Sequence, residues 1–338
     1  MKKFKISGDP QNKPFQSSEI IINSLNKAAK NLGIYDENGV QVHYDCVCND
    51  HRLQTDVFIC PYELNFPNLI LDNAKGRPII GVGRDNLSFI INGGYSPDIS
   101  DYVCLGVDTS IWYDEHSEKF DKFTFCLLGE SNTRSGYDKS VIAFCEAFSG
   151  DESVQLYIRD RTTIPKFKNW VLEQSQKYKV KIIYDEGHLS DHAIERKIYN
   201  KCHFHIYVNR SSTWAMPAIQ SLACGLPLIG MAYSGPREYL SHEHTGLEVN
   251  YSLELVTLNG LQGLVELGLN NYIFPPHNRI YPNQPYWAEP NVDDLIKKLQ
   301  YARHQGPTKY KDNCIAVAKN LSWEKSALNL SLVLDRWF

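Results

Sequence analysis

The chain has 338 residues, 43% of them apolar and 22% charged, and a formal net charge of −4. This composition excludes a disordered or fibrous protein, and the length allows two domains of ordinary size. No apolar run approaches the roughly 18 to 20 residues of a membrane helix, and the first residues lack the apolar core of a signal peptide, so we expect a cytoplasmic protein. A mildly acidic chain has no general attraction for phosphate backbones, so nucleic acid is not an expected partner.

The first third of the chain alternates short apolar stretches with polar segments. Residues 4–8 are predicted to form a strand, followed by a polar loop and a helix that Ser17 or Ser18 can cap and Gly33 can end. Apolar residues recur every three or four positions inside that helix. Further strands are predicted at residues 40–44, 56–60, 78–82 and 102–107. These elements predict a small α/β domain over residues 1–113.

A clearer alternation begins near residue 123. Strands are predicted at residues 123–128, 154–158, 180–184, 203–208 and 226–231. One helix, from Gly136 onward, has an apolar face of Val141, Phe144, Cys145 and Phe148; another, from Ser190 onward, directs Ala193, Ile194 and Ile198 inward. Continuous apolar strands that alternate with amphipathic helices predict a parallel sheet covered on both faces, as in a Rossmann-type domain.

The domain boundaries follow from composition. Residues 114–122 are charged and poor in apolar side chains, and they are the predicted linker. The second domain then extends over residues 123–320, with helices predicted at 291–304 and 310–319. A final helix, over residues 321–338, is predicted to begin at the capping residue Ser322. The nine scattered cysteines suit reduced thiols in the core.

Three strand-to-helix loops of the second domain could carry chemistry. They cover residues 129–136, 184–188 and 209–217. In an open parallel sheet, ligands bind beyond the carboxyl ends of the strands, where free N–H groups of helices face an anion. Pro217 fits the first turn of a helix, because its missing N–H costs nothing there. We therefore expect the N–H groups of Ala215, Met216 and Ala218 to point toward a phosphate, although an ordinary βα unit would have the same pattern.

A resemblance to a known family rests on residues 211–240. This segment combines a small-residue helix, a Gly-Leu-Pro turn at 225–227, a strand and Gly-Pro-Arg-Glu at 235–238. It resembles the donor-site segment of GT-B glycosyltransferases, specifically retaining glycosyltransferase family 4. Three further segments agree in order and spacing: Gly106-Val107-Asp108, His188-Leu189-Ser190 and Ser322-Trp323-Glu324. The resemblance implies two Rossmann-like α/β domains that face each other across a cleft, with a small N-terminal domain toward which the last helix crosses back.

The resemblance also implies where the substrates bind. The diphosphate and sugar of the donor would contact Arg134, Ser135, Arg210, Ser212, Trp214, Ala215, Met216 and Pro217. The nucleoside would contact Glu186, Gly187, His188 and Gln220, and the acceptor would lie near Gly8, Asp9 and Asn12. No catalytic residue is assigned, because the leaving phosphate can take the acceptor proton in a front-face mechanism.

Four motif positions depart from the family. Its two glutamates fall on Ser212 and Gln220, and its basic pair on the first loop falls on Glu130 and Ser135. Gln220 can still bond a ribose through its amide oxygen, whereas Ser212 is too short to replace a glutamate. Arg134 lies one residue away from the missing basic position and can supply its charge. A diphosphate held by one guanidinium loses charge-assisted hydrogen bonds worth roughly 1.5 to 3 kcal/mol each.

These features predict a glycosyltransferase that moves a hexose or pentose from a nucleoside diphosphate sugar, UDP- or GDP-linked, to a hydroxyl of a glycan, a lipid or another small acceptor. The resemblance implies a retaining transfer that needs neither a metal nor a cofactor. A degenerate relative that binds a nucleotide, a glycan or a protein partner without turnover is the alternative. A transferase for modified DNA bases would share the fold, but residues 1–105 carry ten Lys and Arg against twelve Asp and Glu. Peripheral membrane contact and the oligomeric state stay open.

Metal and dinucleotide sites are not expected. His203 and His205 supply only two ligands of a tetrahedral site. The group formed by Cys46, Cys48 and His51 is too compressed for a zinc knuckle. The Gly-Val-Gly sequence at residues 81–83 lacks the third glycine of the dinucleotide-binding pattern.

Overall fold

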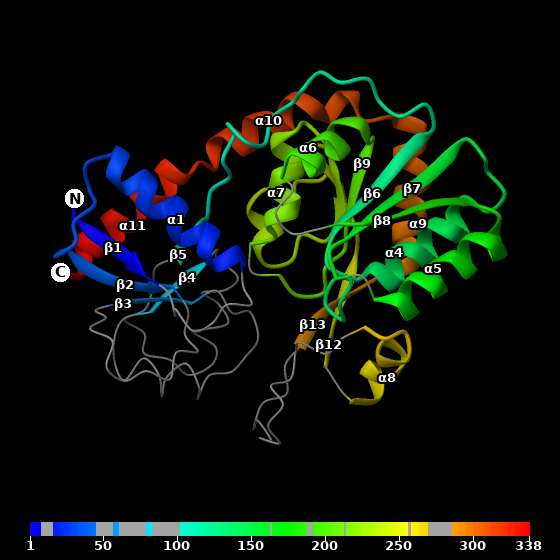
Figure 1. Ribbon diagram of the computed structural model, residues 1–338, viewed down its shortest axis with the longest axis horizontal. Helices are drawn as coiled ribbons and strands as arrows, with labels where there is room; N and C mark the ends of the chain where they lie inside the picture. Colours follow the sequence, from blue (N-terminus) through cyan, green and yellow to red (C-terminus); the bar gives the residue numbers. More distant parts are fainter. Residues whose placement is uncertain are drawn as a thin grey trace. The chain divides into compact units, whose positions relative to one another are not determined.

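The computed structural model describes residues 1–7, 16–44, 57–60, 79–82, 102–162, 164–187, 192–212, 214–255, 258–269 and 286–338. The chain divides into two compact units (Figure 1): Met1–Asp108 together with Asn320–Phe338, and Thr109–Lys319. Each unit is an α/β structure built around a parallel sheet.

The first unit contains a five-stranded sheet in the order β1-β2-β3-β4-β5, in which all neighbouring strands are parallel. The strands are β1 (Phe4–Ser7), β2 (Val40–Tyr44), β3 (Val57–Cys60), β4 (Ile79–Val82) and β5 (Tyr102–Val103). Helices α1 (Gln16–Asn31) and α11 (Trp323–Trp337) pack against each other in this unit. The strands predicted here are all present, although β5 is much shorter than the apolar stretch 102–107.

The last helix belongs to the first unit. Ser322 caps it, because its side chain accepts a hydrogen bond from the N–H of Lys325, which confirms the predicted start. The N–H of Val107 donates to the carbonyl of Leu321 at 2.9 Å. A Cβ atom at Gly106 would lie 2.4 Å from the backbone nitrogen of Trp323, so the close approach of this turn requires a glycine.

The second unit contains a six-stranded sheet in the order β11-β10-β9-β6-β7-β8, again with parallel neighbours. The strands are β6 (Phe123–Gly129), β7 (Val154–Asp160), β8 (Lys181–Glu186), β9 (Phe204–Tyr207), β10 (Leu228–Gly230) and β11 (Gly246–Glu248). Helices α6 (His192–Lys201) and α7 (Met216–Ala223) cover one face (Figure 1), and α4 (Tyr137–Ala147), α5 (Pro165–Tyr178) and α9 (Val292–Gln305) cover the other. The apolar face predicted for α4 is buried: Val141, Phe144, Cys145 and Phe148.

The remaining elements of the second unit follow β10. An antiparallel pair of strands, β12 (Tyr251–Leu255) and β13 (Tyr286–Pro290), forms a separate small sheet, and helix α8 (Leu258–Glu266) follows β12. Two short 3₁₀ turns, η1 (Gly235–Glu238) and η2 (Thr308–Tyr310), precede β11 and α10 (Lys311–Asn320). The pairing with β12 fixes the position of β13, which carries Glu289 opposite Ser252.

The buried face of α6 differs from the prediction. Ile194 is 41% exposed, and Ala193 is exposed as well, whereas Ile198 is buried as expected. The helix instead buries Glu195, which forms a bidentate ion pair with Arg161. Because a buried carboxylate needs such a partner, the ion pair fixes the rotation of the helix and directs the two apolar side chains outward.

The predicted linker packs on the second unit. Asp114 forms an ion pair with Lys311 at 2.6 Å, and the ammonium group of Lys119 donates to the carbonyl of Cys202 at 2.7 Å. The division between the two units lies between Asp108 and Thr109, before the predicted boundary at residue 113. Charged side chains of the predicted linker therefore bind to the second unit.

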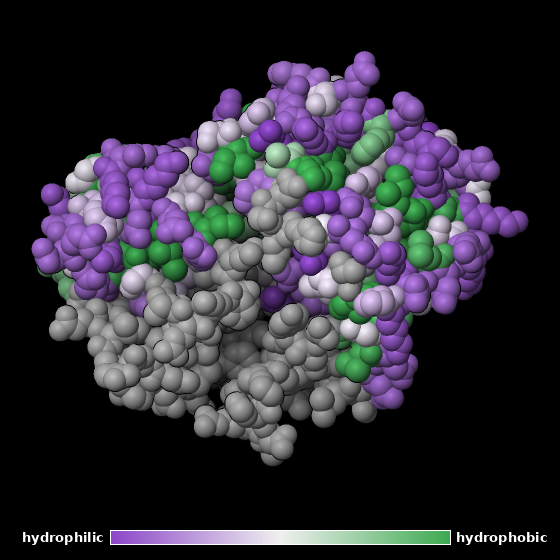
Figure 2. Space-filling model, in the orientation of Figure 1, coloured by the Kyte–Doolittle hydropathy of each residue, from purple (hydrophilic) through white to green (hydrophobic). Residues whose placement is uncertain are grey.

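The face seen in Figure 2 is mainly hydrophilic over the described residues. Among the helix and strand side chains whose exposure the structure describes, the most exposed large apolar ones are Leu253 at 55% and Val265 at 52%, in β12 and α8. None of the described helices combines the length and the hydrophobicity that a membrane span needs.

The buried imidazole of His205 in β9 predicts a loss of stability in acid. The side chain is 1% exposed, and neither ring nitrogen has a hydrogen-bond partner among the described residues. Burial lowers the pKa of His205 from 6.5 to about 3, so between these values the unfolded chain binds a proton that the folded chain does not. Lowering the pH from about 7 to about 5 should therefore remove about 2 kcal/mol of the free energy of unfolding through this group.

We expect His205→Leu to lack this contribution. Urea denaturation of both proteins at the two pH values measures it, and His304→Gln, at an exposed position of α9, controls for the loss of an imidazole as such. An equal pH dependence in His205→Leu and in the wild type would contradict the prediction.

Candidate functional site

The strand order of the second unit indicates where a ligand is expected to bind. The chain leaves β6 toward β7 and β8, and then returns to form β9 and β10 on the other side of β6. Such a reversal of strand order leaves a crevice beyond the carboxyl ends of the two central strands, where ligands of open α/β sheets bind. The loop after β6, residues 130–136, and the loop after β9, residues 208–215, start at this point.

The two loops are joined by backbone contacts. The N–H of Arg210 donates to the carbonyl of Arg134 at 2.7 Å. Gly136 caps α4 with a φ of 67°, and a Cβ atom there would lie 2.2 Å from the carbonyl oxygen of Val208. The residues predicted to hold the diphosphate thus come from two segments that lie against each other.

Several buried polar atoms of these loops lack a hydrogen-bond partner among the residues that the structure describes. They are the Thr133 hydroxyl, the Nε of Arg134, the Tyr137 hydroxyl and the indole nitrogen of Trp214. Burial raises the pKa of Tyr137 well above 10, so its hydroxyl stays protonated and can donate. A buried donor without a partner costs roughly 1 to 3 kcal/mol, and an acceptor-rich ligand would recover this free energy.

The start of α7 differs in one respect from the expectation. Ala215 precedes the helix in the left-handed region, with φ 61°, and Pro217 lies in the first turn as predicted. The Tyr239 hydroxyl donates to the carbonyls of Trp214 and Ala215 at 2.7 and 3.2 Å, which fixes this turn. The N–H of Ala218 donates to the carbonyl of Ala215 at 2.9 Å, so it does not point toward a ligand.

The predicted role of Arg210 is not supported. Its guanidinium is bidentate to Asp138, at 2.8 and 2.7 Å, and bidentate to Glu289, at 2.6 and 3.0 Å. The remaining N–H donates to the carbonyl of Thr133 at 3.0 Å. Burial lowers the pKa of Arg210, but the two carboxylates outweigh it and raise the pKa, so the group is permanently charged. All five guanidinium donors are used inside the protein, and none is left for a phosphate.

Two carboxylates in this cluster had no signal in the sequence. Asp138 lies in the first turn of α4, and Glu289 lies on β13, 79 residues from Arg210. Lys139 adds a second cation, 3.3 Å from Glu289. The cluster connects the small sheet to both loops of the candidate site.

Three further predicted site residues are bonded or buried within the second unit. Ser135 and Ser212 form hydrogen bonds to nearby residues, and Gln220 is buried. The Ser135 hydroxyl donates to the carbonyl of Asn132 at 2.8 Å and so closes the loop after β6. The Ser212 hydroxyl accepts from the hydroxyl of Tyr207 at 3.2 Å. Gln220 is 7% exposed in α7. Ser212 and Gln220, which stand at the positions of the two glutamates of the resembled family, therefore supply no carboxylate.

Asp160 ends β7 and connects this end of β7 to the loop after β6 and to strand β8. Its carboxylate accepts from the N–H and hydroxyl of Ser131 at 3.0 and 2.6 Å, from those of Thr162 at 3.0 and 2.7 Å, and from the Tyr184 hydroxyl. Burial alone would raise the pKa of Asp160, but these donors outweigh it and hold the pKa below its usual range. Asp160 is not among the site residues predicted from the sequence, although an aspartate at the end of a buried strand is a signal that points to it.

Two of the four expected nucleoside residues, Glu186 and Gly187, lie beside this group. The N–H of Gly187 donates to the backbone carbonyl of Asp160 at 2.9 Å. Glu186, at the end of β8, forms an ion pair with Lys168 at 2.6 Å, and its side chain is 46% exposed. His188 and the acceptor-side residues Gly8, Asp9 and Asn12 lie outside the described residues.

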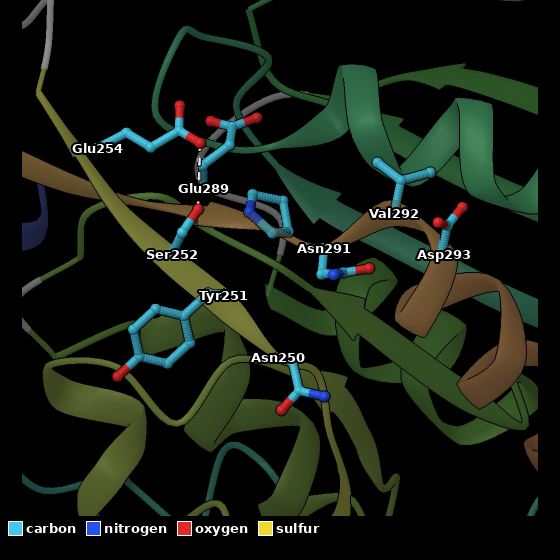
Figure 3. Close-up of a pocket in the computed structure, with 9 residues that line it drawn as sticks. Asn250, Tyr251, Ser252, Glu254, Glu289, Asn291, Val292 and Asp293 are labelled. Carbon is cyan, nitrogen blue, oxygen red and sulfur yellow. Dashed lines mark hydrogen bonds between the residues drawn. The ribbon is translucent and has the colours of Figure 1, made fainter.

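A pocket of about 410 Å³ lies at the small sheet and the start of α9. Figure 3 shows Ser252 hydrogen-bonded to Glu254, with Glu289 next to them. Glu289 lines the pocket and also belongs to the Arg210 cluster. It contains none of the residues predicted from the sequence. Within the described ranges, no group of three or more His, Cys, Asp or Glu side chains could hold a metal ion.

The sequence matches no family model, and no curated protein is similar to it in sequence. The structure is similar to the HepE protein of Anabaena, solved in complex with UDP and glucose, at 9% identity and a TM-score of 0.62, over 99% of this chain and 100% of that chain. Sucrose-phosphate synthase from Thermosynechococcus elongatus is similar at 13% identity and a TM-score of 0.63, over 98% of this chain and 80% of that one. A glycosyltransferase from Rickettsia africae matches at 12% identity and a TM-score of 0.62, over 98% and 96%. The chain therefore has the GT-B fold, as its sequence predicts.

Proposed function

We propose that the protein is a glycosyltransferase that moves a sugar from a nucleoside diphosphate sugar to a hydroxyl acceptor, with retention and without a metal. The observation that carries this proposal is the group of buried, unpaired polar atoms on two joined loops, at the point where ligands bind to this kind of sheet. Hydroxyl, guanidinium and indole groups are the partners that diphosphate oxygens need.

In the proposed reaction, the bond between the sugar C1 and the diphosphate oxygen breaks, and a bond from C1 to the acceptor oxygen forms. Negative charge develops on the leaving diphosphate, where the Arg134 guanidinium, the Thr133 hydroxyl and the N–H groups of Ala215 and Met216 would stabilise it as preorganised donors. The same phosphate would take the acceptor proton. Glu186, Gly187, His188 and Gln220 would bind the nucleoside, and residues 8–12 would face the acceptor.

UDP is the first nucleotide to test. HepE binds UDP and glucose in its crystal structure. A ligand at about 100 times its dissociation constant adds about 2.7 kcal/mol to the free energy of unfolding, so a thermal-shift comparison of UDP, GDP and ADP should single out one base. Release of UDP from UDP-glucose would then test turnover. Retention would be tested by comparing the anomeric configuration of the sugar when it is first released with that of the donor.

Arg134→Ala should raise the Kd for UDP by about 10- to 100-fold, because it removes charge-assisted hydrogen bonds to the diphosphate. Calorimetric titration measures the change. Arg303→Ala removes an exposed arginine from α9 and is the matched control, with an unchanged Kd. Equal Kd values for Arg134→Ala and the wild type would contradict the assignment of the loop after β6 to the diphosphate.

A protein that binds the nucleotide without turnover is the second candidate. The observation that favours it is the replacement of both family glutamates, by Ser212 with its hydroxyl bonded to Tyr207 and by the enclosed Gln220. It predicts tight binding of UDP together with no release of UDP from UDP-glucose, with or without added acceptors.

A further inference from the structure

Arg210 is the most completely bonded cation among the described residues. Its side chain is 1% exposed, and each of its five N–H groups donates to an oxygen. The guanidinium also lies 5.0 Å from the centre of the Trp287 ring, on which it can stack. A group that is buried and paired in this way holds its partners in one geometry.

The partners of Arg210 come from three separate segments. Asp138 belongs to the first turn of α4, Thr133 to the loop after β6, and Glu289 to β13. The backbone of Arg210 adds two further bonds, from its N–H to the carbonyl of Arg134 at 2.7 Å and to its carbonyl from the N–H of Ala288 at 3.0 Å. Arg210 thus holds the carbonyls of two consecutive loop residues, Thr133 and Arg134.

We propose that Arg210 is a positioning residue, which sets the place of the loop after β6 and thereby aims Arg134 at the diphosphate. The role in binding rests on the proposed function; the role in holding the loop does not. The Nε of Arg134 is buried and has no partner among the described residues, whereas its main chain is held by Arg210. Arg210, which the sequence predicted to bind the diphosphate itself, therefore acts through Arg134.

The geometry requires arginine at this position. A lysine would keep the positive charge, but its three donors leave from one nitrogen and cannot span Asp138, Glu289 and the carbonyl of Thr133 together. Arg210→Lys therefore preserves the charge and removes the bridge. Glu289→Gln is a milder variant, because it leaves the bidentate bonds to Asp138 intact.

Binding of UDP by the full-length chain is the first measurement. We expect Arg210→Lys to raise the Kd by about 5- to 20-fold, and Glu289→Gln by about 3-fold. In the Arg134→Ala background, Arg210→Lys should change the Kd by less than about 2-fold, because the group that it positions is gone. Arg196→Lys is the matched control: Arg196 bridges Glu115 and the carbonyl of Ile111 elsewhere in the unit, and its variant should leave the Kd unchanged.

Hydrogen exchange provides a readout that needs no ligand. The N–H groups of Arg134 and Ser135 both donate to the side chain of Asn132 at 3.0 Å, so their exchange reports on the loop. We expect exchange at these amides to accelerate by at least about 10-fold in Arg210→Lys and not in Arg196→Lys. If Arg210→Lys does not fold, the same comparison is made with Glu289→Gln, where an acceleration of about 3-fold is expected.

The outcomes separate the two proposals. Equal exchange at these amides in the Arg210 and Arg196 variants overturns the positioning role, whatever happens to UDP. The action through Arg134 is overturned if Arg210→Lys accelerates amide exchange but leaves the Kd for UDP unchanged. It is also overturned if Arg210→Lys raises this Kd equally in the wild type and in the Arg134→Ala background. Failure of the wild type to bind any nucleotide overturns the proposed function, and hydrogen exchange then decides the positioning role alone.

Discussion

Gly136→Ala is expected to lower the free energy of unfolding of the second unit by about 4 kcal/mol. Gly136 has φ 67°, a region that costs an L-residue about 1 to 2 kcal/mol. Its new Cβ atom would also lie 2.2 Å from the carbonyl oxygen of Val208, and backbone cannot move aside as the end of a flexible side chain can. Urea denaturation followed by circular dichroism measures the loss.

The matched control is Gly150→Ala. Gly150 has φ 76°, but a Cβ atom there would meet nothing within 4 Å. This variant carries the backbone strain without the clash, and it should cost only about 1 to 2 kcal/mol. The difference between the two variants therefore measures the close approach of the loop after β6 to the end of β9. If both variants cost the same, the two loops are not held as closely as described.

The close approach also matters for binding. Relief of the clash must move residues 130–136 away from residue 208, and the unpaired donors of the candidate site lie on both sides of that contact. Where Gly136→Ala still folds, we expect it to lose affinity for UDP, whereas Gly150→Ala should keep it. We therefore expect Gly136→Ala to lower both the free energy of unfolding and the affinity for UDP.

Local patterns in the sequence predicted most of the fold. Buried parallel strands are continuous apolar runs, and a helix start such as Ser322 needs only a hydroxyl and the N–H group three residues later. Both signals lie within a few neighbouring residues. The strands of the first sheet, five of the six strands of the second sheet and the last helix could therefore be predicted without knowledge of tertiary contacts. The sixth strand, β11, has only three residues and was not predicted.

The errors arose where residues far apart in the sequence meet. Arg210 follows a strand, as a phosphate-binding arginine does, but its partners Asp138 and Glu289 lie 72 and 79 residues away. The buried face of α6 depends in the same way on the pairing of Glu195 with Arg161, 34 residues apart. Ion pairs of this kind leave no periodic pattern in the sequence, so charge alone suggested a ligand or a solvated surface.

The position of the site was more predictable than its chemistry. The alternation of strands and helices predicts a parallel sheet whose ligands bind at the loops that follow its strands. Two of the three loops predicted from the sequence are those after β6 and β9, where the observed strand order reverses. Which donors in those loops stay unpaired depends on every neighbour that packs against them. Arg134 and Arg210 are both arginines in such loops, and only the contacts of the folded chain distinguish them.

Asp160→Ala is expected to lower the free energy of unfolding by about 4 kcal/mol, as much as Gly136→Ala. The carboxylate is fully buried and accepts five hydrogen bonds, from Ser131, Thr162 and Tyr184. Its removal leaves these donors without their acceptor at the ends of three adjacent strands. Asp160→Asn keeps one acceptor oxygen and should cost about 2 kcal/mol. Chemical denaturation at pH 7 measures both.

The pH dependence of the free energy of unfolding distinguishes the contribution of the negative charge of Asp160 from that of its hydrogen-bonding geometry. The folded chain lowers the pKa of this carboxyl, so the ionised group contributes stability above the unfolded value of about 4, and this contribution is lost as the pH falls through the lower folded value. The gap in stability between the wild type and Asp160→Asn should therefore narrow below about pH 4. Asp151→Ala, which removes a half-buried carboxylate bonded to Ser153, is the control and should cost at most about 1 kcal/mol. A gap that stays constant down to about pH 2.5 would show that the hydrogen bonds of Asp160 do not depend on its charge.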